Sequence, residues 1–192
     1  NFEINYNKIK AAVNEVYLKV MLYDSSPINS VFHSVSSGIT ESALSVWGFD
    51  VPYLQETVSS ADKGADNYQA VKSVDISTFK EKLTSAYPAC DFSKEQNTWI
   101  TDITRSNAGG VKSLCIASVV ISGQDFAALF SLNSSNFEIS LTQTSATFTT
   151  KGCGHGVGMS QYGANVLAKE GIKYQEILKT YYKGVTFADY DW

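Results

Sequence analysis

The sequence predicts an α+β fold in a single domain, because segments typical of strands and of helices are interspersed and neighbouring strand segments are joined by short turns. Its 192 residues, 44% of them hydrophobic, are enough for one hydrophobic core. A net charge of −4 argues against a nucleic-acid-binding surface. No run approaches the roughly 20 apolar residues of a membrane span. We therefore expect residues 1–192 to form one domain of mostly antiparallel strand pairs with several short helices.

The first elements are expected to be a helix and a hairpin. Apolar residues recur at helical spacing across residues 7–16 and predict an amphipathic helix. Residues 17–23 and 28–33 are typical of strands, and the turn at 24–27 between them predicts that they pair. A long stretch without periodicity then extends to residue 67, and such irregular connections are often functional.

The middle of the chain is expected to contain a short helix and a second hairpin. Thr78 and Glu81 have the spacing of a capping box, which predicts a helix start before Phe79 and Leu83. Residues 99–105 and 111–121 are typical of strands and flank an Asn-Ala-Gly-Gly turn.

The next elements are again a helix and a strand pair. Ser122 and Asp125 resemble a capped helix start, and this helix is expected to extend through Phe130. Residues 137–141 and 146–150 are expected to pair as strands that lead into a glycine-rich segment.

The glycine-rich segment, residues 152–162, has glycine at four alternate positions around His155. Glycine permits positive φ and a close approach of the backbone to another segment or to a ligand. A tight corner packed on the core explains the pattern equally well. Helices are expected over residues 160–169, ended by Gly171, and over residues 174–181.

The three cysteines match no disulfide framework and no zinc motif. Cys115 lies in an apolar run and is expected to be a buried thiol. Cys153 and His155 could supply two metal ligands, whereas a zinc site usually needs three or four. We therefore expect neither a metal nor a cofactor.

The chain has only two histidines, and each lies in a segment of small polar residues. His33 and His155 are expected to meet in one groove. A serine nucleophile is disfavoured, because His33 and Ser34 are neighbours on a strand and no Gly-x-Ser-x-Gly motif is present. A phosphate-binding loop is disfavoured, because the Lys-Ser/Thr ending is missing.

A carbohydrate cleft is the third interpretation of these two segments. The many aromatic residues, eleven Tyr, ten Phe and three Trp, suit stacking on sugars, although most are expected to fill the core. Glycoside cleavage needs a carboxylic acid with a raised pKa, and Glu41 is the only carboxylate in either segment. The expected role of Glu41, however, is at the surface or at a helix cap.

Several motifs together resemble the stage II sporulation protein D family, the amidase-enhancer domain family. Their order and spacing match over nearly the whole chain, and the glycine–histidine motif is the most specific of them. The matching segments are Phe32–Ser42, Val46–Gly48, Val51–Leu54, Lys151–Ala164 and Tyr174–Val185.

The resemblance implies a lytic transglycosylase that cleaves peptidoglycan between N-acetylmuramic acid and N-acetylglucosamine and leaves a 1,6-anhydro end. It implies extracytoplasmic action in spore engulfment, with a partner amidase, a membrane protein of the engulfment machinery and an N-terminal membrane anchor outside this sequence. The family's catalytic glutamate lies in an Ala-Glu-Met-Pro-like segment. That segment is expected upstream of Asn1, so residues 1–192 lack the family's catalytic segment.

By this resemblance the chain supplies a cleft for a glycan strand. The residues expected to bind substrate are His33, Ser34, Ser36, Tyr53, His155 and Gln161. Tyr53 is expected to stack on a sugar ring, and the others are expected to bind hydroxyl and N-acetyl groups. A non-catalytic glycan-binding module or amidase activator, and a hydrolase driven by Glu41, remain as alternatives.

Overall fold

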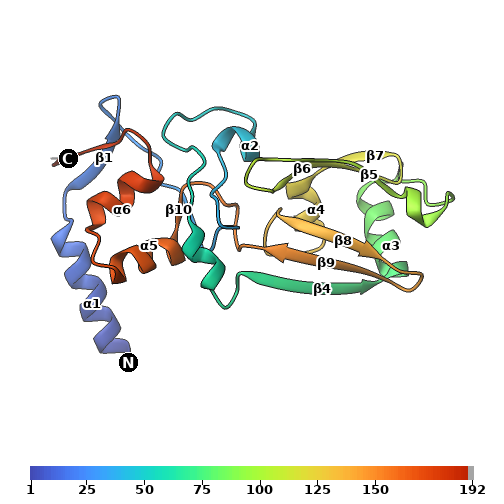
Figure 1. Ribbon diagram of the computed structural model, residues 1–192, viewed down its shortest axis with the longest axis horizontal. Coiled ribbons are helices and arrows are strands. Elements are labelled where there is room, and N and C mark those ends of the chain that lie inside the picture. The colour runs from blue at the N-terminus through green and yellow to red at the C-terminus, as the bar shows by residue number, and fades with distance from the viewer. Residues whose placement is uncertain (190–192) are drawn as a thin grey trace. The chain divides into compact units, whose positions relative to one another are not determined.

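The computed structural model describes residues 1–189, and it confirms the α+β class (Figure 1). Short helices are interspersed with small sheets whose strands pair mostly antiparallel. The chain divides into two compact units. One comprises residues 1–30 together with the C-terminal residues from 184, and the other comprises residues 31–183.

The smaller unit contains one helix and a three-stranded antiparallel sheet in the order β11-β1-β2. Its elements are α1 (Phe2–Glu15), β1 (Lys19–Tyr23), β2 (Ser26–Pro27) and β11 (Thr186–Asp189). Helix α1 begins earlier than the sequence pattern predicts, and none of its residues is buried.

The predicted pairing of residues 17–23 with 28–33 is wrong in its second half. Asp24 and Ser25 adopt positive φ and form a tight turn, so that the returning strand β2 is only two residues long. Strand β3 (Phe32–His33) instead pairs in parallel with β10 (Met159–Ser160). Parallel pairing with a strand more than 120 residues away cannot be predicted from a local turn pattern.

The core of the larger unit is built on two three-stranded antiparallel sheets, ordered β4-β9-β8 and β5-β6-β7 (Figure 1). The first contains β4 (Gln69–Asp75), β8 (Phe137–Leu141) and β9 (Ser145–Lys151), and the second contains β5 (Ile100–Arg105), β6 (Val111–Ile116) and β7 (Val119–Ser122). Helices α3 (Ile76–Ala86) and α4 (Gly123–Leu129) pack on the sheets. Buried aromatic rings fill this core, among them Phe79, Phe126, Phe130, Phe137 and Phe148.

Two predictions in this region are wrong. Residues 111–121 form two strands, because Ala117 and Ser118 adopt positive φ and turn the chain back on itself. The capping box at Thr78 is absent, because β4 continues to Asp75 and α3 begins immediately after it. The cap at Ser122 is confirmed, since its hydroxyl accepts a hydrogen bond from the backbone N–H of Asp125 at 3.0 Å.

The remaining elements of the larger unit are short. They are α2 (Ala43–Trp47), the 3₁₀ helices η1 (Ser60–Gly64) and η2 (Gln96–Thr98), α5 (Gln161–Lys169) and α6 (Tyr174–Tyr181). Gly171 ends the α5 segment with a φ of +88°, as its position predicts. Cys115 is only half-buried, contrary to expectation, and Cys90 is the buried thiol.

Candidate functional site

Two segments far apart in the sequence lie side by side and form the site. Beyond the β3–β10 pair, Val35 and Cys153 exchange two backbone hydrogen bonds, with N···O distances of 3.1 and 2.7 Å. The backbone N–H of Glu41 then donates to the carbonyl of Gly156 at 2.8 Å. Residues 32–42, which contain His33, are therefore joined by backbone hydrogen bonds to the glycine-rich segment.

The close approach of the two segments explains the glycine pattern. All four alternate glycines of residues 152–158 have positive φ. At Gly158 an added Cβ would lie 2.1 Å from the carbonyl oxygen of Val31, and at Gly156 it would lie 2.9 Å from Cγ of Glu41. A side chain at either position would therefore collide with the opposite segment.

Asp62, in η1, links the two segments by accepting a hydrogen bond from each of them. Its side chain is completely buried, and its Oδ2 accepts from the N–H of Ser36 at 2.9 Å while its Oδ1 accepts from the hydroxyl of Ser160 at 2.8 Å. The Ser160 hydroxyl in turn accepts from the N–H of Gly163 and caps α5. Asp62 is not among the predicted residues, and its only sequence signal is its place in the long irregular connection.

The two imidazole rings meet, with their centroids 5.9 Å apart. His33 is 4% exposed, and its Nδ1 donates to the carbonyl of Val157 at 3.2 Å, so its buried Nε2 holds a lone pair with no partner. Burial lowers the pKa of His33 to about 4. Burial also lowers the pKa of His155, whose Nδ1 accepts from the N–H of Val157 at 3.1 Å. Both rings are therefore neutral at pH 7.

An exposed aromatic surface adjoins this pair. The ring of Trp47, at the end of α2, lies 5.6 Å from that of His155 and 6.0 Å from that of Phe49. Trp47 is 37% exposed and Phe49 is 57% exposed. The two rings therefore form an exposed apolar surface next to the histidine pair. Neither is among the predicted site residues, although Trp47 lies in one of the family-like motifs.

Glu41 is buried, and the prediction of a surface or capping role is wrong. It is 6% exposed, and its Oε1 accepts from the hydroxyl of Ser106 at 2.8 Å and from the N–H of Gly110 at 3.1 Å. The adjacent Ser42 caps α2 instead. The Oε2 atom of Glu41 is buried and has no partner, and burial raises the pKa of the carboxyl.

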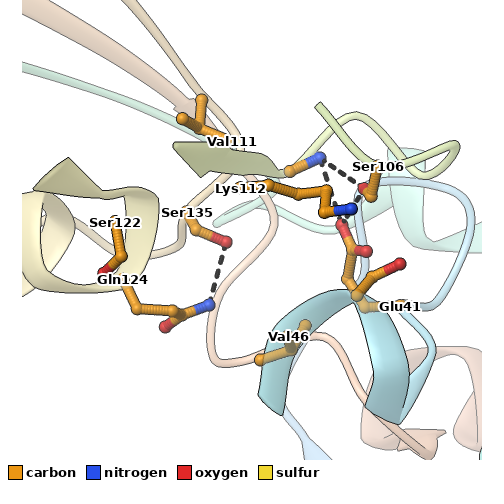
Figure 2. Close-up of a pocket in the computed structure, with 10 residues that line it drawn as sticks. Glu41, Val46, Ser106, Val111, Lys112, Ser122, Gln124 and Ser135 are labelled. Carbon is orange, nitrogen blue, oxygen red and sulfur yellow. Dashed lines mark hydrogen bonds between the residues drawn. The ribbon is translucent and has the colours of Figure 1, made fainter. Parts of the chain in front are cut away.

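Glu41 borders two cavities, the first of which is drawn in Figure 2. The larger, of about 100 Å³, lies between α2, the turn before β6 and the start of α4. The smaller, of about 20 Å³, is lined by the two joined segments and by residues 134–136. Ser135 also lines both cavities, and His155 lines the smaller one. Glu41 therefore lines both the smaller cavity, which His155 also lines, and the larger cavity.

The structure brings together only part of the predicted set. His155 and Ser36 line the smaller cavity, and His33 is buried against His155. The other three predicted residues line neither cavity: Ser34 and Tyr53 are half-buried, and Gln161 is exposed in the first turn of α5.

Within residues 1–189, no group of three or more His, Cys, Asp or Glu side chains is placed to hold a metal ion. The helices of that same range include none that is both long enough and apolar enough to cross a membrane.

Comparison with known proteins finds curated relatives. The chain is 35% identical over 192 residues to stage II sporulation protein D of Bacillus subtilis, an alignment that covers all of this chain and 54% of that protein. It is 30% identical over 186 residues to an uncharacterized protein of Brachyspira hyodysenteriae, covering 95% of this chain and 49% of that protein. A more distant relative is the amidase enhancer of Bacillus subtilis, with 25% identity over 234 residues, 97% of this chain and 33% of that protein.

No protein-family model matches the chain. The chain spans about half the length of the stage II sporulation protein D to which it is similar. The similarity nevertheless runs from the first residue to the last and includes both joined segments of the site. By its sequence, the chain belongs to the stage II sporulation protein D family, as its motifs predict.

Proposed function

We propose that this chain forms the glycan-binding cleft of a peptidoglycan lytic transglycosylase that acts in spore engulfment. The observation that supports this most directly is the exposed aromatic surface of Trp47 and Phe49, which continues through His155 to the cavities beside Glu41. Pyranose rings present apolar C–H faces that pack on exposed aromatic rings. Their hydroxyl and acetamido groups need hydrogen-bonding partners, and small hydroxyl side chains line both cavities.

The reaction in this proposal needs only one carboxylic acid. The acid gives its proton to the glycosidic oxygen as the bond from C1 to that oxygen breaks. As a carboxylate it then takes the proton of the C6 hydroxyl, whose oxygen bonds to C1 and closes the anhydro ring. No water is consumed, and the acid ends in its starting state. The family resemblance assigns this acid to a segment upstream of Asn1, so residues 1–192 bind and orient the strand.

The Glu41-driven hydrolase is less well supported by the site. Most glycoside hydrolases use two carboxyl groups, one as the acid and one as the base or nucleophile. Glu41 has the raised pKa that suits an acid, but no second carboxylate lines either cavity within the described part of the chain.

A non-catalytic glycan-binding module or amidase activator is the second candidate, and the name of the distant amidase enhancer favours it. Both candidates place the chain outside the cytoplasm, near a partner amidase and a membrane protein of the engulfment machinery. The family name, which refers to sporulation, supports that setting.

Binding of a chitooligosaccharide tests the proposed cleft. We expect the wild-type chain to bind chitotetraose by titration calorimetry, and Trp47→Ala and His155→Ala to weaken the affinity about tenfold each. Phe2→Ala is the control, because Phe2 is an 85% exposed ring in the smaller unit. Unchanged affinity in both site variants would refute the placement of the cleft. Anhydro ends released from denuded glycan strands would reject the purely non-catalytic candidate.

A further inference from the structure

The cavity of about 100 Å³ beside Glu41 is lined by two apolar residues, Val46 from α2 and Val111 from β6. The rest of its wall is polar and includes Ser45, Ser106 and Gln124. One water needs about 10–15 Å³ of such space, so the cavity can hold a group of several heavy atoms. A small group with one apolar end and one hydrogen-bonding end would fit these walls.

Glu41 lines this cavity, and one of its two carboxyl oxygens has no hydrogen-bond partner. Two donors, the Ser106 hydroxyl and the Gly110 N–H, already occupy its Oε1. Its Oε2 is buried with no partner, and a buried carboxylate oxygen without a partner is costly. The neutral acid avoids that cost, with Oε1 as the carbonyl oxygen and the proton on Oε2. In that form Glu41 is a donor that lacks an acceptor.

We propose that this cavity is the subsite for the N-acetyl group of a sugar, and that Glu41 recognises the acetyl oxygen by donating a hydrogen bond from Oε2. Val46 and Val111 contact the acetyl methyl group. An acetamido oxygen supplies the acceptor that Oε2 lacks. This inference rests on the proposed glycan-binding function and adds the chemical group that the site selects.

Lys112 does not change this assignment. It lines the same cavity, and in Figure 2 its side chain extends toward the Glu41 side. No ion pair between Lys112 and Glu41 is found in the described part of the chain, and the residue is exposed. Glu41 is therefore available as a neutral donor to a neutral amide, with Lys112 at the solvent side.

The test compares chitotetraose with the tetramer of glucosamine, which lacks the acetyl groups, using titration calorimetry. We expect the wild-type chain to favour the acetylated sugar at least about tenfold. Glu41→Gln retains an acceptor and an N–H donor and should keep the preference, whereas Glu41→Leu has neither and should lose it. Val46→Phe fills the cavity without altering the acid and should also lose it. Glu81→Gln, an exposed position on α3, is the control.

The outcomes separate this inference from the function on which it rests. If Glu41→Leu folds and keeps the preference for the acetylated sugar, the assignment of Glu41 is overturned while the cleft stands. If Glu41→Leu fails to fold, Val46→Phe decides, and an unchanged preference in that variant overturns the subsite. If the wild-type chain binds neither sugar while remaining folded, the proposed glycan-binding function fails as well. If Glu41→Gln loses the preference as Glu41→Leu does, hydrogen-bond donation is not the basis of selection.

Discussion

Acidification should destabilise this chain through His33. The imidazole is almost completely buried, its Nδ1 donates to Val157, and its Nε2 has no acceptor nearby. A second proton would have to go on Nε2, in a buried place beside His155. Burial accordingly lowers the pKa of His33 from 6.5 to about 4.

The two pKa values of His33, 6.5 in the unfolded chain and about 4 in the folded chain, determine the sign and the size of the loss of stability. The unfolded chain protonates His33 near pH 6.5 and the folded chain only near pH 4, so the unfolded state holds more protons between them. The contribution of His33 to the stability is therefore complete above pH 6.5, falls as the pH drops from 6.5 to about 4, and changes no further below pH 4. The difference between the two pKa values corresponds to about 3 kcal/mol, most of which should be lost by pH 4.5.

Urea unfolding at pH 7.5 and 4.5, followed by tryptophan fluorescence, measures this loss. His33→Gln removes the titrating group and keeps a polar side chain that can donate to Val157. We expect the wild-type chain to lose about 2.5 kcal/mol more than His33→Gln between the two pH values. His155→Gln is the matched comparison, because that ring is only half-buried. Equal losses in the wild-type chain and in His33→Gln would refute the assignment of a buried, neutral imidazole.

Three further changes probe the framework of the site. Gly158→Ala forces a Cβ against the Val31 carbonyl and should destabilise the chain by more than about 3 kcal/mol in urea unfolding. Gly171→Ala is the control, because its added Cβ meets nothing within 4 Å, and it should cost about 1 kcal/mol. Similar losses in the two variants would contradict the close approach of Gly158 to Val31. Asp62→Ala leaves two buried donors unpaired and should cost about 3 kcal/mol by the same assay, and a neutral result would disprove its bridging role. Because burial raises the pKa of Glu41, the wild-type chain should lose stability as the pH rises above about 4.5, and Glu41→Gln should remove this dependence when unfolding is compared at pH 5 and 8.

The elements that the sequence predicts correctly are those defined by neighbouring residues. The Ser122 cap involves a residue only three positions away, and β8 and β9 are joined by a short turn. The α5 segment lies between a serine cap and Gly171. Each of these signals lies inside the element it defines, so a pattern in one sequence is sufficient to detect it.

Burial of Glu41 could not be predicted in this way. Its two donors, Ser106 and Gly110, lie 65 and 69 positions further along the chain. Nothing in the sequence around Glu41 indicates that the turn before β6 covers it. Trp47 illustrates the same limit, because its aromatic partner His155 comes from the other joined segment. Local patterns identified the two segments, whereas the chemical environment of their side chains depends on long-range contacts.

The glycine pattern had two possible explanations, a close approach to a ligand and a tight corner packed on the core. The geometry favours packing, since the Cβ position of Gly156 is occupied by the side chain of Glu41 and that of Gly158 by the backbone of Val31. The pattern is still related to the site, because the space left by the missing side chain at Gly156 is where the Cβ and Cγ atoms of Glu41 pass. A glycine with a structural role thus determines where the acid lies, and Gly156→Ala should alter sugar selectivity as well as stability.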